Sequence, residues 1–237
     1  YGAGGFVAEV GDGTSSKGVS SGAQNVKLNQ WQHVAMVFDG TTGNLSLYID
    51  GVLQGTSLST GYSAIKNSSS SLKFGAYSTT FGQYFKGGLD EVRIWNVAKT
   101  QAQIQTYYNR NLTGKEQGLA GYWNFEEITG NTVNDLTANK NNGTLTNGVQ
   151  RTVANTNPIT RPEGKTLYFD GVNDYINAGS NISFSNFTIS TWVYMNSNPS
   201  SLNALISKIS TNFQNFELAI NSVSNDPVFS WGNGSSW

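Results

Sequence analysis

The sequence predicts an all-β protein, folded as an antiparallel β-sandwich of the jelly-roll type with one short surface helix near residues 100–109. Three observations lead to this prediction. Apolar residues alternate in many short runs, Gly, Asn, Asp and Ser separate these runs, and no regular succession of strands and helices is present. The last point excludes a parallel α/β fold. With 237 residues, the chain is long enough to bury a large core.

The clearest strands lie in the first part of the chain. Apolar side chains alternate over residues 33–39 and 45–49, and further strands are expected over 72–75 and 88–96. Asp50 and Gly51 stand between two apolar runs. An Asp-Gly pair favours a type I′ turn, because both central residues of that turn need a positive φ. The sequence therefore predicts a tight hairpin at this point.

One helix is expected after these strands. Thr100 and Gln103 have the spacing of a capping box, in which each side chain satisfies a backbone N–H of the other residue. Ala102, Ile104 and Tyr108 suit a short amphipathic stretch, and the Asn-rich segment up to Gly114 ends it. A single helix of this length is expected to cover part of a sheet.

A second series of strands follows a polar join at residues 112–118. These strands are expected over residues 166–170, 188–195, 204–209, 216–220 and 227–231. Residues 216–220 (FELAI) also echo residues 6–10 (FVAEV), and each stretch is followed by a Trp, at 237 and 31. A repeat this long indicates tandem domains, not a solenoid of 20–50-residue units.

Composition excludes several classes of protein. The chain has 14 Lys and Arg against 15 Asp and Glu, so no basic field is available to hold nucleic acid. No Cys is present, which excludes disulfides and thiolate metal sites. No apolar run reaches the roughly 20 residues of a membrane span. The first residues contain neither a start Met nor a basic stretch, so we expect a piece of a longer chain.

Several motifs resemble a known family. Residues 31–35 (WQHVA), 47–51 (LYIDG) and 88–96 (GLDEVRIWN) are similar to the second half of a laminin-G-like domain. Residues 118–126 (GLAGYWNFE), 135–143 (DLTANKNNG) and 169–176 (FDGVNDYI) resemble the opening half of the same domain. The resemblance implies a concanavalin A-like jelly roll, also similar to pentraxins.

The order of these halves is reversed with respect to the family. Residues 1–113 are expected to be the C-terminal half of a first laminin-G-like module, and residues 114–237 the N-terminal half of a second. Either the chain crosses two adjacent modules, or it is circularly permuted and its two halves fold against each other. We favour the first alternative, because a permuted single domain would need the duplicated strand only once.

Glycoside hydrolysis is not expected. Laminarinase-like relatives with this fold carry a Glu-x-Asp-x-x-Glu strand, which places two carboxyl groups about 5–5.5 Å apart, and this triplet does not occur in the sequence. Glu126 and Glu127 are adjacent, as are Asp90 and Glu91, so each pair should point to opposite faces of a strand. His33 is the one histidine, and we interpret it as a structural residue. We therefore expect no enzyme.

Calcium is the cofactor that the resemblance implies. Calcium takes oxygen ligands from Asp, Asn and backbone carbonyls. One candidate loop carries Asp135, Asn139 and Asn141, and a second carries Asp170 and Asp174. The alternative is that these residues only form Asx-turns.

A polar, aromatic loop is the candidate for ligand binding. It carries Tyr77, Phe81 and Tyr84 within eight residues, and loops on a rigid scaffold are common recognition sites. Asp90 presents a separate question. Alternation places it on the same face as Val92 and Ile94, so its carboxylate must accept hydrogen bonds or bind a metal.

These observations lead to one functional hypothesis and one rival. We expect a non-catalytic, extracellular module of a cell-surface adhesion protein, similar to large bacterial adhesins. Its partners would be a glycan or another cell-surface ligand and neighbouring modules of the same chain. The rival is a structural spacer that extends a stalk and binds nothing specific.

Overall fold

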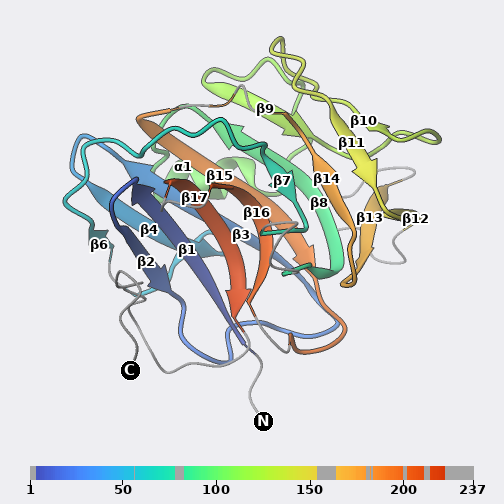
Figure 1. The fold of residues 1–237 in the computed structure, drawn as a ribbon, viewed down its shortest axis with the longest axis horizontal. Coiled ribbons are helices and arrows are strands. Elements are labelled where there is room, and N and C mark those ends of the chain that lie inside the picture. The colour runs from blue at the N-terminus through green and yellow to red at the C-terminus, as the bar shows by residue number, and fades with distance from the viewer. Residues whose placement is uncertain are drawn as a thin grey trace.

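Two antiparallel β-sheets lie face to face in the computed structural model of the chain (Figure 1). The structure describes residues 4–55, 57–77, 83–153, 164–179, 182, 184–199, 202–210 and 214–221. The fold is the predicted all-β, antiparallel sandwich. The strand expected over 227–231 lies outside the described residues.

The first sheet has eight described strands. In order across the sheet they are β10 (Thr132–Val133), β11 (Gly143–Thr146), β14 (Tyr175–Asn177), β7 (Lys73–Phe74), β16 (Asn203–Ser210), β17 (Gln214–Asn221), β1 (Gly5–Asp12) and β2 (Ser16–Ser20). Figure 1 shows this sheet toward the viewer.

The second sheet has nine described strands. Seven follow one another as β12 (Gln150–Val153), β13 (Lys165–Asp170), β8 (Lys86–Trp95), β15 (Asn186–Tyr194), β3 (Trp31–Asp39), β4 (Asn44–Ile49) and β5 (Val52–Leu53). In addition, β6 (Leu58–Ser59) pairs with β4, and β9 (Leu119–Trp123) pairs with β8.

Strands from both parts of the chain alternate within each sheet. In the first sheet β7 lies between β14 and β16, and in the second β8 lies between β13 and β15. Residues 1–113 and 114–237 are therefore not separate in the structure, because each supplies strands that the other pairs with. This interleaving is the arrangement that circular permutation requires. The origin of the two parts in successive modules stays a prediction.

The duplicated strand occurs twice in the same sheet. Residues 6–10 belong to β1 and residues 216–220 to β17, and the two strands pair antiparallel with Phe6 opposite Ile220 and Val10 opposite Phe216. Both copies therefore belong to one sheet of this structure, and the choice between adjacent modules and circular permutation stays a prediction. Each copy covers a backbone edge of the other, which an isolated half would leave open.

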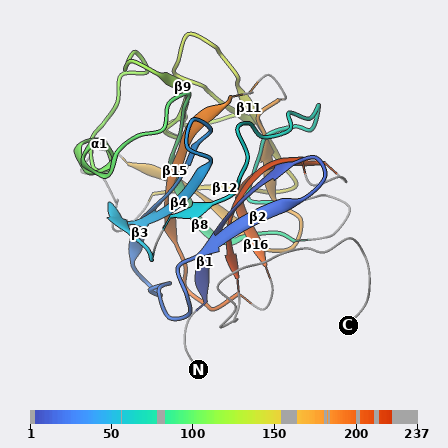
Figure 2. The same ribbon diagram turned by 90° about the vertical axis from the view of Figure 1, so that its left-hand side faces the viewer.

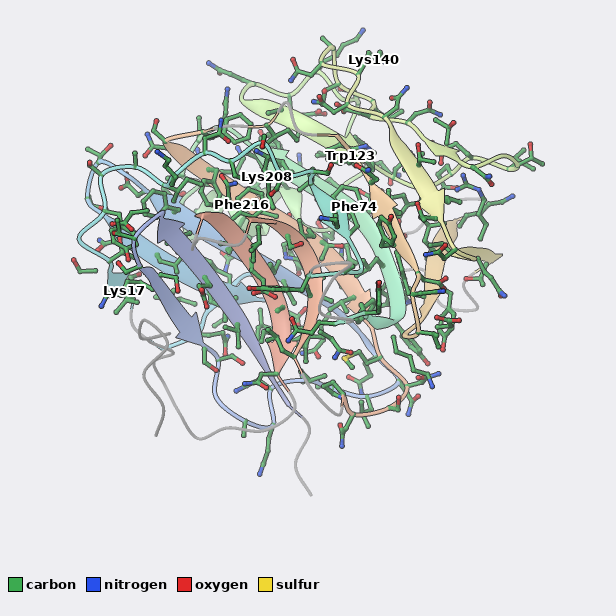
Figure 3. All side chains as sticks on the ribbon, viewed as in Figure 1. Lys17, Phe74, Trp123, Lys140, Lys208 and Phe216 are labelled. Atoms are coloured by element: carbon green, nitrogen blue, oxygen red, sulfur yellow. The ribbon has the colours of Figure 1, made fainter. Side chains whose placement is uncertain are left out.

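Aromatic side chains fill the space between the sheets. Phe74 on β7 meets Trp123 on β9 edge-on at a centroid distance of 5.0 Å, and Phe187 on β15 lies 5.4 Å from Phe216 on β17. All four are nearly or fully buried. Both pairs join one sheet to the other, and three of these residues are labelled inside the sandwich in Figure 3. Such pairs add about 0.5–1.5 kcal/mol each beyond the burial of their area.

The predicted hairpin and helix cap are both present. Asp50 and Gly51 have φ values of 49° and 75°, as a type I′ turn between β4 and β5 requires. Helix α1 (Gln101–Tyr107) begins at Thr100 with a complete capping box to Gln103. Its single buried residue, Ile104, packs against the outer face of the second sheet. Figure 2 shows α1 on that side of the sandwich, away from β1 and β2.

A β-bulge in β8 corrects the expectation for Asp90. The pairing with β15 shifts register next to Glu91, which has a positive φ of 55°. Leu89, Val92 and Ile94 consequently all pack in the core, so the simple alternation that placed Asp90 beside Val92 fails. The buried Asp90 carboxylate accepts a hydrogen bond of 2.8 Å from the Glu91 N–H, as a buried carboxylate should.

No membrane-spanning helix is found among the described residues, where α1 has only seven residues.

Candidate functional site

The described ends of the predicted aromatic loop, which follows β7, pair with each other and form the base of a hairpin. Ala76 forms a bridge with Tyr84, and the Tyr77 N–H donates to the Gln83 carbonyl at 3.1 Å. Tyr77 and Tyr84 are both partly exposed. Phe81 lies outside the described residues. The structure therefore brings two of the three predicted ligand-binding residues together.

Two glutamates stand directly opposite each other on the strands beside this hairpin. Glu9 on β1 pairs with Glu217 on β17. Side chains in such a cross-strand pair have Cβ atoms about 4.5–5.5 Å apart. Phe6, Ala8 and Val10 point into the core, so alternation along β1 directs Glu9 to the outer face of the first sheet.

Burial gives the two carboxyl groups different properties. Glu217 is 5% exposed, and burial together with the charge of Glu9 raises its pKa well above 4.5. Burial also raises the pKa of Glu9, and the nearby Ser16 opposes part of this shift. Glu217 therefore retains its proton at higher pH than a free glutamate, and its Oε1 has no hydrogen-bond partner among the described residues.

Tyr77 completes this arrangement. Burial and the charges of Glu217 and Glu9 raise the pKa of its phenol to about 12, so the side chain is neutral and close to both carboxyl groups. Ser207 on β16 donates to the Ala76 carbonyl at 2.7 Å and to the Tyr77 carbonyl at 3.2 Å. These bonds fix the base of the hairpin on the strand next to β17. We call Glu9, Glu217 and Tyr77 the Glu9–Glu217 site.

The site combines groups that suit a polyhydroxylated ligand. Carboxyl oxygens accept hydrogen bonds from hydroxyl groups, and such bonds are strong when the acceptor is ionised. A tyrosine ring offers an apolar face and a polar end. Glu217 is buried, so a ligand would contact the partly exposed Glu9 and Tyr77.

The first calcium loop has a different hydrogen-bonding pattern from a cation site. Asp135 Oδ1 accepts from the N–H groups of Tyr122 at 3.1 Å and Thr137 at 2.9 Å. Its Oδ2 accepts from the Asn141 N–H at 2.9 Å and from the Asn141 side-chain amide at 3.4 Å. The amide of Asn139 donates to the Ala120 carbonyl at 2.9 Å. Because N–H donors surround the carboxylate, this loop does not fit calcium and matches the Asx-turn alternative.

The second loop leaves more oxygen atoms available. Asp174 Oδ2 accepts from the Asp170 N–H at 3.0 Å, whereas its buried Oδ1 has no partner among the described residues. Burial raises the pKa of Asp174, while the hydrogen bond from the Asp170 N–H opposes this shift and the charge of Asp170 adds to it. Only two carboxylates meet here, and nowhere in the described part of the chain do three His, Asp or Glu side chains gather as a metal site. Calcium binding stays a prediction.

The remaining adjacent carboxylates have structural partners. Glu91 forms a buried ion pair with Arg93 and accepts from the Tyr122 hydroxyl at 2.9 Å. Glu126 accepts from the Lys165 N–H, and Glu127 forms an ion pair with Arg151. None of these pairs belongs to the Glu9–Glu217 site.

The sequence contains only a weak signal for the Glu9–Glu217 site, and none of its motifs includes these two residues. Glu9 and Glu217 each occupy an outward position in a strand whose alternate residues are apolar. Each glutamate alone is typical of a solvent-facing strand position. Only the pairing of β1 with β17, from opposite ends of the chain, brings them together.

Comparison with known families supports the fold. Residues 1–105 match the Laminin_G_3 family model, described as the concanavalin A-like lectin/glucanases superfamily. This match supports a laminin-G-like domain. The comparisons with curated proteins and with solved structures found no match.

Proposed function

We propose that the chain is a non-catalytic binding module that recognises a glycan at the Glu9–Glu217 site. The observation that carries the proposal is the carboxyl pair itself, in which the partly exposed Glu9 and Tyr77 lie beside the buried Glu217. The superfamily match fits a carbohydrate- or ligand-binding module.

The same pair raises glycoside hydrolysis as a second candidate. Two carboxyl groups about 5–5.5 Å apart, one protonated and one ionised, are the requirement of a retaining glycosidase. We favour binding over hydrolysis because Glu217 is only 5% exposed, and an acid–nucleophile pair must flank a glycosidic bond. Release of nitrophenol from nitrophenyl glycosides by the wild-type protein, lost in Glu217→Gln, would reverse this preference.

The proposed biological setting is the one that the sequence predicts. We propose an extracellular adhesion protein on a cell surface, in which neighbouring modules of the same chain repeat the binding site. Repetition would raise a weak single-site affinity through effective concentration. Calcium has no role at Asp135 in this proposal, since N–H donors occupy that carboxylate.

A glycan array tests the proposal. The wild-type protein should bind a defined set of glycans, in calcium and in excess chelator alike, and Tyr77→Ala should lose that signal. Tyr168→Ala is the matched control, because Tyr168 is also half-buried but lies on β13 of the other sheet. Absence of specific binding by the wild-type protein would support the spacer and contradict the proposal.

A further inference from the structure

A small cavity lies between helix α1 and the outer face of the second sheet. It has a volume of about 10 Å³, and its lining includes His33, Arg93 and Lys99 together with the rings of Trp95 and Tyr107. That volume is room for one water-sized species. We call it the α1 cavity. The α1 cavity lies against the second sheet, whereas the Glu9–Glu217 site belongs to the first sheet.

Lys99 brings an unbalanced positive charge to this cavity. The side chain is 7% exposed. Its Nζ lies 3.7 Å from the ring centroid of Trp95 and 4.8 Å from that of Tyr107. In the described part of the chain, no carboxylate lies within 4.0 Å of this ammonium. The rings offset part of the charge, and partial burial lowers the pKa of Lys99 because the ammonium loses part of its hydration.

His33 contributes an unsatisfied buried ring to the same cavity. It is 2% exposed, and neither Nδ1 nor Nε2 has a hydrogen-bond partner among the described residues. Edge contacts with Tyr108 at 5.5 Å and Trp192 at 5.6 Å hold the ring. Burial and the charge of Arg93 lower its pKa well below 6.5. The neutral ring therefore has one N–H available, which no hydrogen bond uses among the described residues.

Arg93 supplies a third donor. Its Nη atoms are used by Glu91 and by the carbonyls of Tyr107 and Arg110, at 2.6 and 2.7 Å for the carbonyls. Its Nε is buried and has no partner among the described residues. Glu91 balances the charge of Arg93, so Lys99 is the source of the excess positive charge.

We propose that the α1 cavity binds one small inorganic anion of the size of chloride. Two of its lining groups have no hydrogen-bond partner among the described residues, the Arg93 Nε–H and one N–H of His33, and the Lys99 side chain lines the same cavity. A single acceptor in their midst would satisfy donors that are otherwise unpaired. A negative charge would also balance Lys99, which a water molecule does not do.

Bromide serves as the probe in a crystal of the intact chain. An anomalous peak inside the α1 cavity, next to Lys99 and His33, is the expected result. The melting temperature Tm is then followed while sodium chloride replaces sodium gluconate at constant ionic strength. A saturable rise in Tm is expected, because the ion binds only the folded state.

Lys99→Met separates this site from a general salt effect. The substitution keeps an apolar side chain against Trp95 and removes the charge, so the chloride affinity should fall by about tenfold or more. Lys140→Met is the control, since Lys140 lies exposed on a distant loop (Figure 3). A bromide crystal of the wild-type protein with no anomalous peak in the cavity would overturn the proposal. This test does not depend on whether Lys99→Met folds. An equal chloride response in both variants would also overturn the proposal.

Discussion

Glu9 on β1 faces Glu217 on β17, although the two residues come from opposite ends of the chain. Burial raises the pKa of Glu217, so this side chain stays protonated to a higher pH than a free glutamate, while Glu9 is partly exposed. Two like charges directly opposite each other on adjacent strands would destabilise the pairing of those strands. The same relationship therefore links the stability of the sandwich to the chemistry of the proposed binding site.

Glu217 should make the stability of the protein depend on pH. Its folded-state pKa lies well above 4.5, so its contribution to stability is fully present below pH 4.5 and is lost as the pH rises through the folded pKa. Glu217→Gln removes the titrating group. We expect Tm of the wild-type protein to fall over this range relative to Tm of the variant, as measured by thermal unfolding at a series of pH values.

Glu9→Gln provides the matched test of this assignment. It removes the charge that helps to raise the pKa of Glu217, so the loss of stability with rising pH should be smaller than in the wild-type protein. Identical pH profiles for the wild-type protein and Glu217→Gln would show that Glu217 is not the group responsible.

The buried Arg93–Glu91 ion pair should contribute strongly to stability. Both side chains are at most 1% exposed, and Arg93 also bonds to the carbonyls of Tyr107 and Arg110. Arg93→Met leaves the Glu91 charge buried without its partner, so we expect a loss of about 3–5 kcal/mol in the free energy of unfolding. Urea denaturation measures this loss.

Arg151→Met is the control for that measurement. The Arg151–Glu127 pair is more exposed, at 11% and 16%, and such a pair is worth about 0–1 kcal/mol. Comparable losses in the two variants would contradict the role assigned to the buried pair.

Asp135 should stabilise the fold without any metal. Asp135→Ala removes the acceptor for N–H groups of Tyr122, Thr137 and Asn141, which should cost about 1–3 kcal/mol in the free energy of unfolding. The wild-type protein should unfold at the same Tm in calcium and in excess chelator. A Tm that falls on chelation in the wild-type protein but not in Asp135→Ala would instead assign calcium to this loop.

The tight turn between β4 and β5 should tolerate only glycine at position 51. Gly51 has a φ of 75°, and an added Cβ would lie 2.8 Å from Cγ of Gln105 on α1. Gly51→Ala should therefore lose more stability than Gly55→Ala. Gly55 has a φ of 65° but no atom within 4 Å of an added Cβ. Gly55→Ala should therefore lose only the free energy of placing a non-glycine residue in the left-handed region, about 1–2 kcal/mol. Equal losses in urea denaturation would show that the contact with α1 does not matter.

Local patterns in the sequence predicted the elements of the fold well. Alternation identified β3, β4 and β15, and the capping box at Thr100 identified the start of α1, because these signals depend on neighbours within a few residues. Asp90 was misplaced because a bulge at Glu91 interrupts the alternation. A bulge depends on the partner strand, which the local pattern does not contain.

The candidate site was predicted only in part. Tyr77 belongs to the local cluster of aromatic residues that the sequence marks as a candidate ligand-binding loop. Glu9 and Glu217 were missed because their contact requires the pairing of β1 with β17. Calcium was expected at Asp135 because its carboxylate offers oxygen atoms. These oxygen atoms accept hydrogen bonds from backbone N–H groups, and this becomes evident only when the loop folds.

Isothermal titration with a glycan selected on the array tests the central claim most directly. If the glycan binds at the Glu9–Glu217 site, Tyr77→Ala and Glu9→Gln should each weaken its affinity by about tenfold or more, since each removes a ring contact or a charged hydrogen-bond acceptor. Tyr168→Ala should bind as the wild-type protein does. Unchanged affinity in both site variants would place the glycan elsewhere on the molecule and contradict the account.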